Sequence, residues 1–188
     1  MLRVPETREG DGMVRVWDPF VRLFHWSLAG GIAAAWLTSS ARDDTHQWIG
    51  LGVAGLVSFR IVWGVFGPPY ARFTRFVCGP KAVSQYLFDI VVGAEKRYLG
   101  HNPAGGAMIV ALLTMILLTT FTGWLMTDDT YYGDDTMQLV HATSAYTIIV
   151  LVVLHVIGVA VASFRHRENI VVAMITGWKR KAEGDDIA

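Results

Sequence analysis

The stretch Met137–Phe164, MQLVHATSAYTIIVLVVLHVIGVAVASF, combines a long apolar run with two histidines, His141 and His155. Their spacing of fourteen residues is close to four helical turns, so both imidazoles are expected on one face of a helix, about 21 Å apart along its axis. Ionisable side chains inside a membrane helix are costly and usually functional. The pair therefore suggests two metal centres, one above the other across a bilayer.

Three earlier segments are also long enough to cross the hydrocarbon core of a membrane, which needs roughly 20 residues. The four predicted spans cover about 20–38, 47–66, 105–126 and 139–164. The chain has 188 residues, of which 53% are hydrophobic, and this predicts one all-α integral membrane domain, residues 1–188, folded as a four-helix bundle. Two amphipathic segments, about 81–92 and 169–178, are expected to lie along the membrane surface.

Basic residues are distributed unequally between the two sides of this bundle. The N-terminal segment, the loop between spans two and three, and the C-terminal tail together carry fourteen of the sixteen lysines and arginines, whereas the opposite side carries only Arg42. The positive-inside rule therefore predicts that both termini are cytoplasmic. The first span is long and Trp-rich, so we expect it to be retained rather than cleaved as a signal peptide.

Four of the six histidines are expected to form two pairs at two membrane depths. His25 and His155 share the inner half of the bilayer, and His46 and His141 share its outer edge. Two opposed imidazoles on facing helices are what a six-coordinate b-type haem needs. With both axial positions filled by protein, such a haem favours electron transfer over chemistry at the iron.

Other metal centres suit the sequence less well. The single cysteine, Cys78, excludes a covalent Cys-x-x-Cys-His haem attachment and a four-thiolate cluster. A di-iron bundle needs several inward glutamates, and the predicted spans contain none. The remaining histidines, His101 and His166, fall in the cytoplasmic loop and tail and are interpreted as structural. A haem-free, histidine-lined transporter stays open as an alternative of another class.

Arg60 is the one basic residue inside a predicted span. It follows His46 by fourteen residues, so it is expected on the same helix face at the inner depth. A buried arginine needs an anionic partner, and a propionate of the inner haem is a good candidate. Snorkelling of Arg60 to lipid headgroups is the alternative.

Acidic residues mark the predicted periplasmic side. Six aspartates are expected there: Asp43, Asp44, Asp128, Asp129, Asp134 and Asp135. Acidic patches steer basic partners and raise association rates, so these side chains are candidates for docking a soluble cytochrome c. The alternative is that they are ordinary residues of solvated loops.

Several stretches between about Val14 and Arg180 match one family pattern. They are Val16-Trp17-Asp18-Pro19, Arg22-Leu23-Phe24-His25-Trp26, His46-Gln47-Trp48-Ile49-Gly50, Phe59-Arg60, Trp63-Gly64, Gly100-His101-Asn102-Pro103, His141 with His155, Glu168-Asn169, and Met174-Ile175-Thr176-Gly177. In these stretches the chain resembles the bacterial cytochrome b-561 family, which includes the cytochrome b subunits of nickel–iron hydrogenases.

The resemblance implies a four-helix cytochrome of the bacterial inner membrane with two stacked haems b. By this resemblance, His25 and His155 would ligate the inner haem, His46 and His141 would ligate the outer haem, and His101 would not be a ligand. Members exchange electrons between the quinone pool and a periplasmic redox partner. The expected partners are thus quinone, membrane lipid and a cytochrome c or other redox protein, with a homodimer left open and no nucleic acid.

Three functions within this class remain open from the sequence. The first is electron transfer between quinone and a periplasmic cytochrome c. The second is a superoxide:quinone oxidoreductase, although six aspartates would repel an anionic substrate. The third is a membrane anchor subunit for a hydrogenase or another dehydrogenase. Whether the chain is itself an enzyme, and the direction of electron flow, are left open by the sequence.

Overall fold

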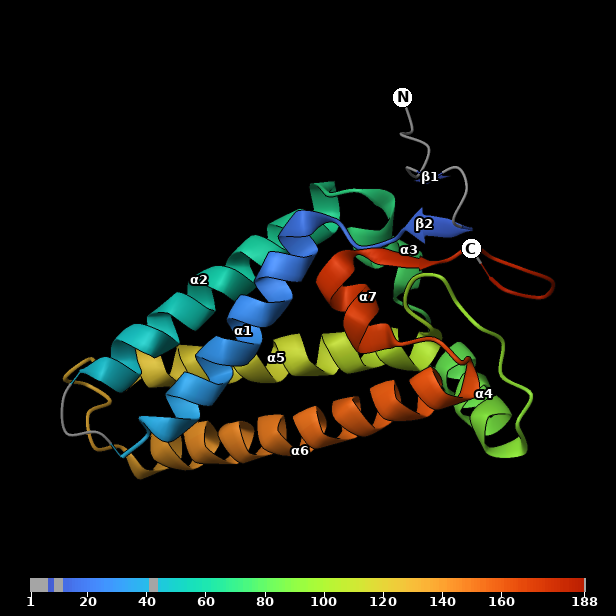
Figure 1. Ribbon diagram of the computed structural model, residues 1–188. Coiled ribbons are helices and arrows are strands. Elements are labelled where there is room, and N and C mark those ends of the chain that lie inside the picture. Colours follow the sequence, from blue (N-terminus) through green and yellow to red (C-terminus); the bar gives the residue numbers. More distant parts are fainter. Residues whose placement is uncertain (1–6, 9–11, 41–43, 188) are drawn as a thin grey trace.

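Four long helices form the body of the computed structural model, which describes residues 7–8, 12–40 and 44–187 (Figure 1). They are α1 (Pro19–Leu37), α2 (Thr45–Phe66), α5 (Pro103–Leu125) and α6 (Asp135–Arg165). Each is long and apolar enough to cross a membrane. The predicted helical membrane bundle is thus confirmed, and every helix end lies within four residues of the expected one.

Capping residues set where three of these helices begin. Asp18 accepts hydrogen bonds from the amides of Phe20 and Val21 at the start of α1. Asn102 and Asp134 accept from the third residue of α5 and of α6 in the same way. A side-chain acceptor at this position satisfies backbone N–H groups that have no partner within the helix.

The helices pack in sequence order. α1 packs on α2, α2 on α5, and α5 on α6, whereas neither α1 nor α2 approaches the backbone of α6 extensively. The core between the helices includes Phe24, Val57 and Ile116. Only a small part of α6 is buried within the chain, and it exposes large apolar side chains such as Val153 and Ile157, as expected for a lipid-facing helix.

The two ends of the bundle differ. At one end, here the cap end, lie the start of α1, η1 (Pro69–Ala71), α3 (Phe73–Phe76), α4 (Pro80–Val92) and α7 (Ile170–Thr176) (Figure 1). Short connections between α1 and α2 and between α5 and α6 make the opposite loop end. An antiparallel sheet completes the cap end; its order is β1 (Thr7–Arg8), β2 (Met13–Arg15), β3 (Trp178–Arg180).

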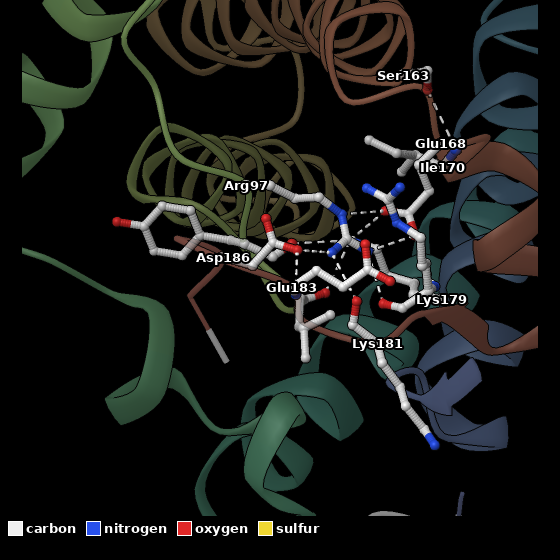
Figure 2. A network of polar contacts seen from close by, with 11 residues as sticks. Arg97, Ser163, Glu168, Ile170, Lys179, Lys181, Glu183 and Asp186 are labelled. Atoms are coloured by element: carbon white, nitrogen blue, oxygen red, sulfur yellow. Dashed lines mark hydrogen bonds and ion pairs between the residues drawn. The ribbon is translucent and has the colours of Figure 1, made fainter. Parts of the chain in front are cut away.

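A buried ionic network fastens the C-terminal tail to the cap end (Figure 2). Arg97, which is 5% exposed, forms ion pairs with Glu168 and Asp186, and Lys179 lies 3.4 Å from Glu168. The Lys179 ammonium also donates to the carbonyl oxygens of Tyr98 and Leu99. These contacts join the loop before α5 to residues more than seventy positions later in the chain.

The structure adds detail to the segment 169–178, which was predicted to be amphipathic and interfacial. Within this segment α7 ends at Thr176, and Trp178 belongs to β3. Gly177 has a φ of +89°, in the left-handed region that ends helices, and its amide donates to Ala173 O. Pairing of β3 with β2 then replaces a further helical turn. That α4 and α7 lie on a membrane surface stays a prediction.

Candidate functional site

The first candidate site lies between α1 and α6, toward the cap end. The imidazoles of His25 and His155 face each other across it, with ring centroids 6.4 Å apart and an angle of 50° between the ring planes. Two imidazoles that bind one iron from opposite sides place their centroids roughly 6.3 Å apart, since each metal–nitrogen bond is about 2.0 Å long. The separation of the two rings therefore suits axial ligation of a haem.

The second candidate site lies between α2 and α6, toward the loop end. His46 and His141 face each other with ring centroids 6.1 Å apart and an angle of 75° between the planes. Each pair thus joins α6 to a helix that does not pack extensively along it. A flat macrocycle needs this arrangement, because helices in close contact would leave no space for it.

Hydrogen bonds orient both histidines of the loop-end pair. His46 Nδ1 lies 2.9 Å from Ala35 O, and His141 Nδ1 lies 2.9 Å from Thr119 O. A carbonyl oxygen can only accept, so each Nδ1 carries the proton and each Nε2 keeps a lone pair for a metal. Metal-binding histidines usually have such a partner on the other ring nitrogen, because it sets the tautomer and the ring orientation.

A glycine makes room for one of these rings. A Cβ added at Gly123 would lie 3.0 Å from Cε1 and 3.3 Å from Nδ1 of His141. Gly123 is on α5, the helix that packs most closely on α6. The small residue therefore lets the ring of His141 lie against the α5 backbone and reach Thr119 O.

The donor set suits haem better than the metal centres weighed from the sequence. Among residues 7–8, 12–40 and 44–187, no three His, Cys, Asp or Glu side chains gather at one metal-sized position. A di-iron or tetrahedral zinc centre needs at least that many protein ligands. Haem needs only two, because its porphyrin supplies the four equatorial nitrogens.

Arg60 lies inside the bundle at the cap end, not at the lipid surface. Its side chain is 3% exposed, its guanidinium carbon lies 4.8 Å from the centroid of the Phe73 ring, and Nη2 donates to Ala71 O at 3.1 Å. Nη1 is buried and has no hydrogen-bond partner in the described part of the chain. This burial speaks against snorkelling to lipid headgroups, and within residues 7–8, 12–40 and 44–187 no carboxylate forms an ion pair with Arg60.

His101 occupies a place that its position in the sequence did not indicate. Its ring lies 4.6 Å from those of both Trp17 and Phe76, and its Nδ1 is buried without a partner among the described residues. Burial, together with the positive charges of Arg60 and Lys179, lowers the pKa of His101 to about 3. His101 is therefore neutral. The Gly-His-Asn-Pro motif was the only sequence signal for it.

The remaining predicted positions are at the surface or at helix ends. His166 is the C-terminal cap residue of α6 and is half-buried. Five of the six aspartates are exposed at the loop end: Asp44, Asp128, Asp129, Asp134 and Asp135. Hydrogen bonds from Thr130 lower the pKa of Asp128, so its carboxylate is ionised at neutral pH. Asp43 and Arg42 lie outside the described residues.

Comparison with known proteins identifies a family for this chain. No individual curated protein matches the chain. The model of one family, described as prokaryotic cytochrome b561, matches residues 16–177, which include both histidine pairs, Arg60 and His101. The match covers most of the chain, and the protein therefore belongs to the prokaryotic cytochrome b561 family, whose members are haem b-binding membrane proteins of electron transfer.

Proposed function

We propose that this cytochrome holds two haems b and transfers electrons between the quinone pool and a periplasmic redox protein, most simply a soluble cytochrome c. The observation that carries the proposal is the presence of two facing imidazole pairs, at 6.4 Å and 6.1 Å, at two levels of the same helix α6. Two redox centres stacked along one transmembrane helix would connect the two faces of a membrane.

In this proposal each bound haem supplies one-electron redox chemistry, and the chain supplies ligation and environment. His25 and His155 would hold the inner haem, and His46 and His141 would hold the outer one. With two protein ligands on each iron, neither oxygen nor substrate has an open coordination position. Arg60 would balance the charge of an inner propionate.

The proposed orientation puts the cap end in the cytoplasm. The described basic residues outside the spans lie at the cap end, and the described aspartates 44, 128, 129, 134 and 135 lie at the loop end. The positive-inside rule supports this orientation. The aspartates would then face the periplasm, where they can steer a basic cytochrome c. Quinone would react near the inner pair, because transmembrane electron transfer needs the two reactions on opposite sides.

The other functions are weaker on specific grounds. A superoxide:quinone oxidoreductase would have to attract an anion to a loop end whose described surface carries five exposed aspartates. A haem-free transporter is disfavoured because the chain belongs to a family of b-type cytochromes. A membrane anchor for a larger dehydrogenase would use the same two haem sites. It would differ from the proposed function only in its periplasmic partner, which would be the dehydrogenase and not a soluble cytochrome c.

Rapid mixing of the holoprotein in lipid nanodiscs tests the proposal. We expect a short-chain quinol to reduce the haems, and oxidised basic cytochrome c to reoxidise them without added mediator. A matched measurement with His166→Ala should give the same rates, because His166 contacts neither pair. Haem that quinol cannot reduce would overturn the quinone half, and haem that cytochrome c cannot reoxidise would overturn the partner half.

A further inference from the structure

Buried polar atoms without hydrogen-bond partners are gathered at one end of the molecule. Across the described residues they are Trp17 Nε1, Arg22 Nε, His25 Nδ1, Arg60 Nη1, Trp63 Nε1 and His101 Nδ1. All six belong to the segments that meet at the cap end: the start of α1, the end of α2 and the turn before α5. Folded proteins satisfy nearly all buried polar groups, so a cluster of this kind calls for a common acceptor.

Three of these donors surround the same small residue, Ala71. Arg60 donates through Nη2 to Ala71 O, and Ala71 packs in a core cluster with Trp17 and Trp63. His101 adjoins them, because its ring lies 4.6 Å from the ring of Trp17. We call Arg60, Trp17, Trp63 and His101 the donor cradle.

The donor cradle needs an anion. Arg60 is 3% exposed, and no ion pair with a carboxylate is present for it among the described residues. Asp18 acts on it electrostatically, but no ion pair joins the two among the described residues, and Asp18 Oδ1 accepts from the amides of Phe20 and Val21. Burying an unpaired charge is strongly destabilising. An acceptor with several negatively charged oxygens would satisfy both the charge and the N–H groups.

We infer that the donor cradle binds the propionate carboxylates of the inner haem, an inference that rests on the proposed function. His25 lies on α1 about two helical turns after Trp17, and its Nδ1 is itself one of the six unpartnered atoms, so the cradle adjoins the site where that haem would be held. A lipid phosphate offers similar chemistry. However, Arg60 and Trp17 are only 3% and 4% exposed, so a group bound within the protein reaches them more readily than a lipid headgroup does.

The loop-end pair has no comparable set of donors. In the described residues near His46 and His141, both Nδ1 atoms are bonded to carbonyl oxygens and no buried polar side-chain atom lacks a partner. The two haems would thus be held differently. The inner one would depend on a buried cation and N–H donors at its carboxylate edge, and the outer one would depend on well-oriented axial histidines alone.

Two properties of the inner haem should therefore depend on Arg60. The positive charge of Arg60 disfavours the ferric iron relative to the ferrous iron, so its removal should lower the inner midpoint potential. Loss of a charge-assisted hydrogen bond should also accelerate release of the inner haem by about tenfold. The His155→Ala variant identifies which spectral and potentiometric component belongs to the inner haem.

Redox titration and haem transfer to apomyoglobin, both on the holoprotein in nanodiscs, test the inference. Arg60→Gln should lower the inner potential and speed loss of the inner haem, with the outer haem unchanged. Arg60→Lys should restore part of both properties. Trp63→Phe and His101→Phe should speed the loss to a smaller extent. Arg75→Gln is the matched control, since Arg75 is an exposed arginine on α3, in the cap-end segment that follows α2.

Varying the lipid composition of the nanodiscs distinguishes a haem propionate from a lipid phosphate as the bound anion. Each variant is measured in discs of phosphatidylcholine alone and in discs that also contain phosphatidylglycerol. Equal effects of Arg60→Gln in both discs support the propionates, whereas an effect confined to phosphatidylglycerol would assign the site to a lipid phosphate and overturn the inference.

The outcomes also separate the inference from the proposed function. Two haems per chain with an inner potential and release rate unchanged in Arg60→Gln would overturn the donor cradle alone. A single haem with the His25 and His155 pair unused would overturn both. If Arg60→Gln yields no folded holoprotein, unchanged haem release in both Trp63→Phe and His101→Phe overturns the cradle.

Discussion

Arg97 donates two hydrogen bonds to the carboxylate of Glu168, one from Nη2 to Oε1 at 2.8 Å and one from Nε to Oε2 at 3.2 Å. The same guanidinium pairs with Asp186, so one buried cation joins the loop before α5, the turn after α6 and the C-terminal tail (Figure 2). Such bidentate, charge-assisted pairs are among the stronger polar contacts in proteins. The network therefore holds the cap over the end of the bundle that carries the His25 and His155 pair.

The attachment of the tail should weaken in acid. Burial alone would raise the pKa of Glu168, but the hydrogen bond from Arg97 and the charge of Lys179 outweigh it, and the pKa lies below its ordinary value. The pKa of Asp186 is lowered in the same way by the Glu183 amide and by Arg97. Carboxylates with a depressed folded-state pKa stabilise the fold above their unfolded values of about 4, and this contribution is lost as the pH falls through the folded pKa.

Hydrogen exchange of the backbone amides in residues 178–187 measures this attachment. We expect protection at neutral pH and its loss below about pH 4. Glu168→Gln should reduce the protection already at pH 7, by roughly 1–3 kcal/mol of local stability, because Arg97 keeps a neutral acceptor but loses its charged partner. Glu183→Gln is the matched control, since the side chain of Glu183 is exposed. Equal exchange in the two variants would show that the network does not hold the tail.

Haem content should be two haems b per chain, held without covalent attachment. The reason is the two imidazole pairs and the single cysteine, Cys78, which cannot form a Cys-x-x-Cys-His attachment. The pyridine haemochrome assay measures both the haem type and the ratio. A ratio of one, or haem that resists acid–acetone extraction, would contradict this prediction.

Single histidine substitutions should remove the haems selectively. His155→Ala is expected to lose the inner haem, and His141→Ala to lose the outer one, because each leaves a single imidazole at its site. His101→Ala and His166→Ala should keep both haems as purified, because neither residue is a proposed axial ligand, although His101→Ala should release the inner haem faster than the unchanged protein does. Haem content and low-temperature absorption spectra of the four variants give the result. If His101→Ala lost a haem while His46→Ala kept both, the proposed pairing of the histidines would be wrong.

Gly123 offers a test of the outer site that leaves every histidine in place. Gly123→Val should displace the His141 ring from Thr119 O, because even a Cβ at this position lies 3.0 Å from that ring. We expect several-fold faster loss of the outer haem, measured by transfer to apomyoglobin, with the inner haem unchanged. Gly55→Val is the control: nothing lies within 4 Å of a Cβ there, and Gly55 is on the face of α2 opposite His46. If Gly123→Val and Gly55→Val lost the outer haem at the same rate, Gly123 would not be needed to make room for the His141 ring.

The loop-end aspartates should govern encounter with a basic cytochrome c. Changing Asp128, Asp129, Asp134 and Asp135 together to Asn is expected to slow electron exchange several-fold at low salt, and the effect should shrink at high salt, because the Debye length is only about 8 Å at physiological ionic strength. Asparagine keeps the capping role of Asp134, which accepts from Met137 N, so the helix start should survive. Stopped-flow kinetics at low and high salt measure the rate of electron exchange with cytochrome c in the unchanged protein and in the aspartate variant. An unchanged rate at low salt would mean that the aspartates are only solvated surface.

The sequence by itself determined the helical membrane bundle and the helix face that His141 and His155 share. A span is defined by its own length and apolar content, because the bilayer interior requires a helix to satisfy its backbone locally. The periodicity of an α-helix likewise places His141 and His155 on one face from their spacing alone. These are properties of single segments, so they can be read without knowledge of neighbouring helices.

Only the tertiary structure decided how the surroundings of the two pairs differ. The carbonyl of Ala35 reaches His46 from α1, and the buried positions of Arg60 and His101 depend on packing between α2, α3 and the turn before α5. The pairing of Arg97 with Glu168 joins residues 71 positions apart, and β3 forms because β2 lies beside the tail. Such contacts depend on which segments meet in three dimensions. The composition and periodicity of a single segment do not determine its tertiary neighbours.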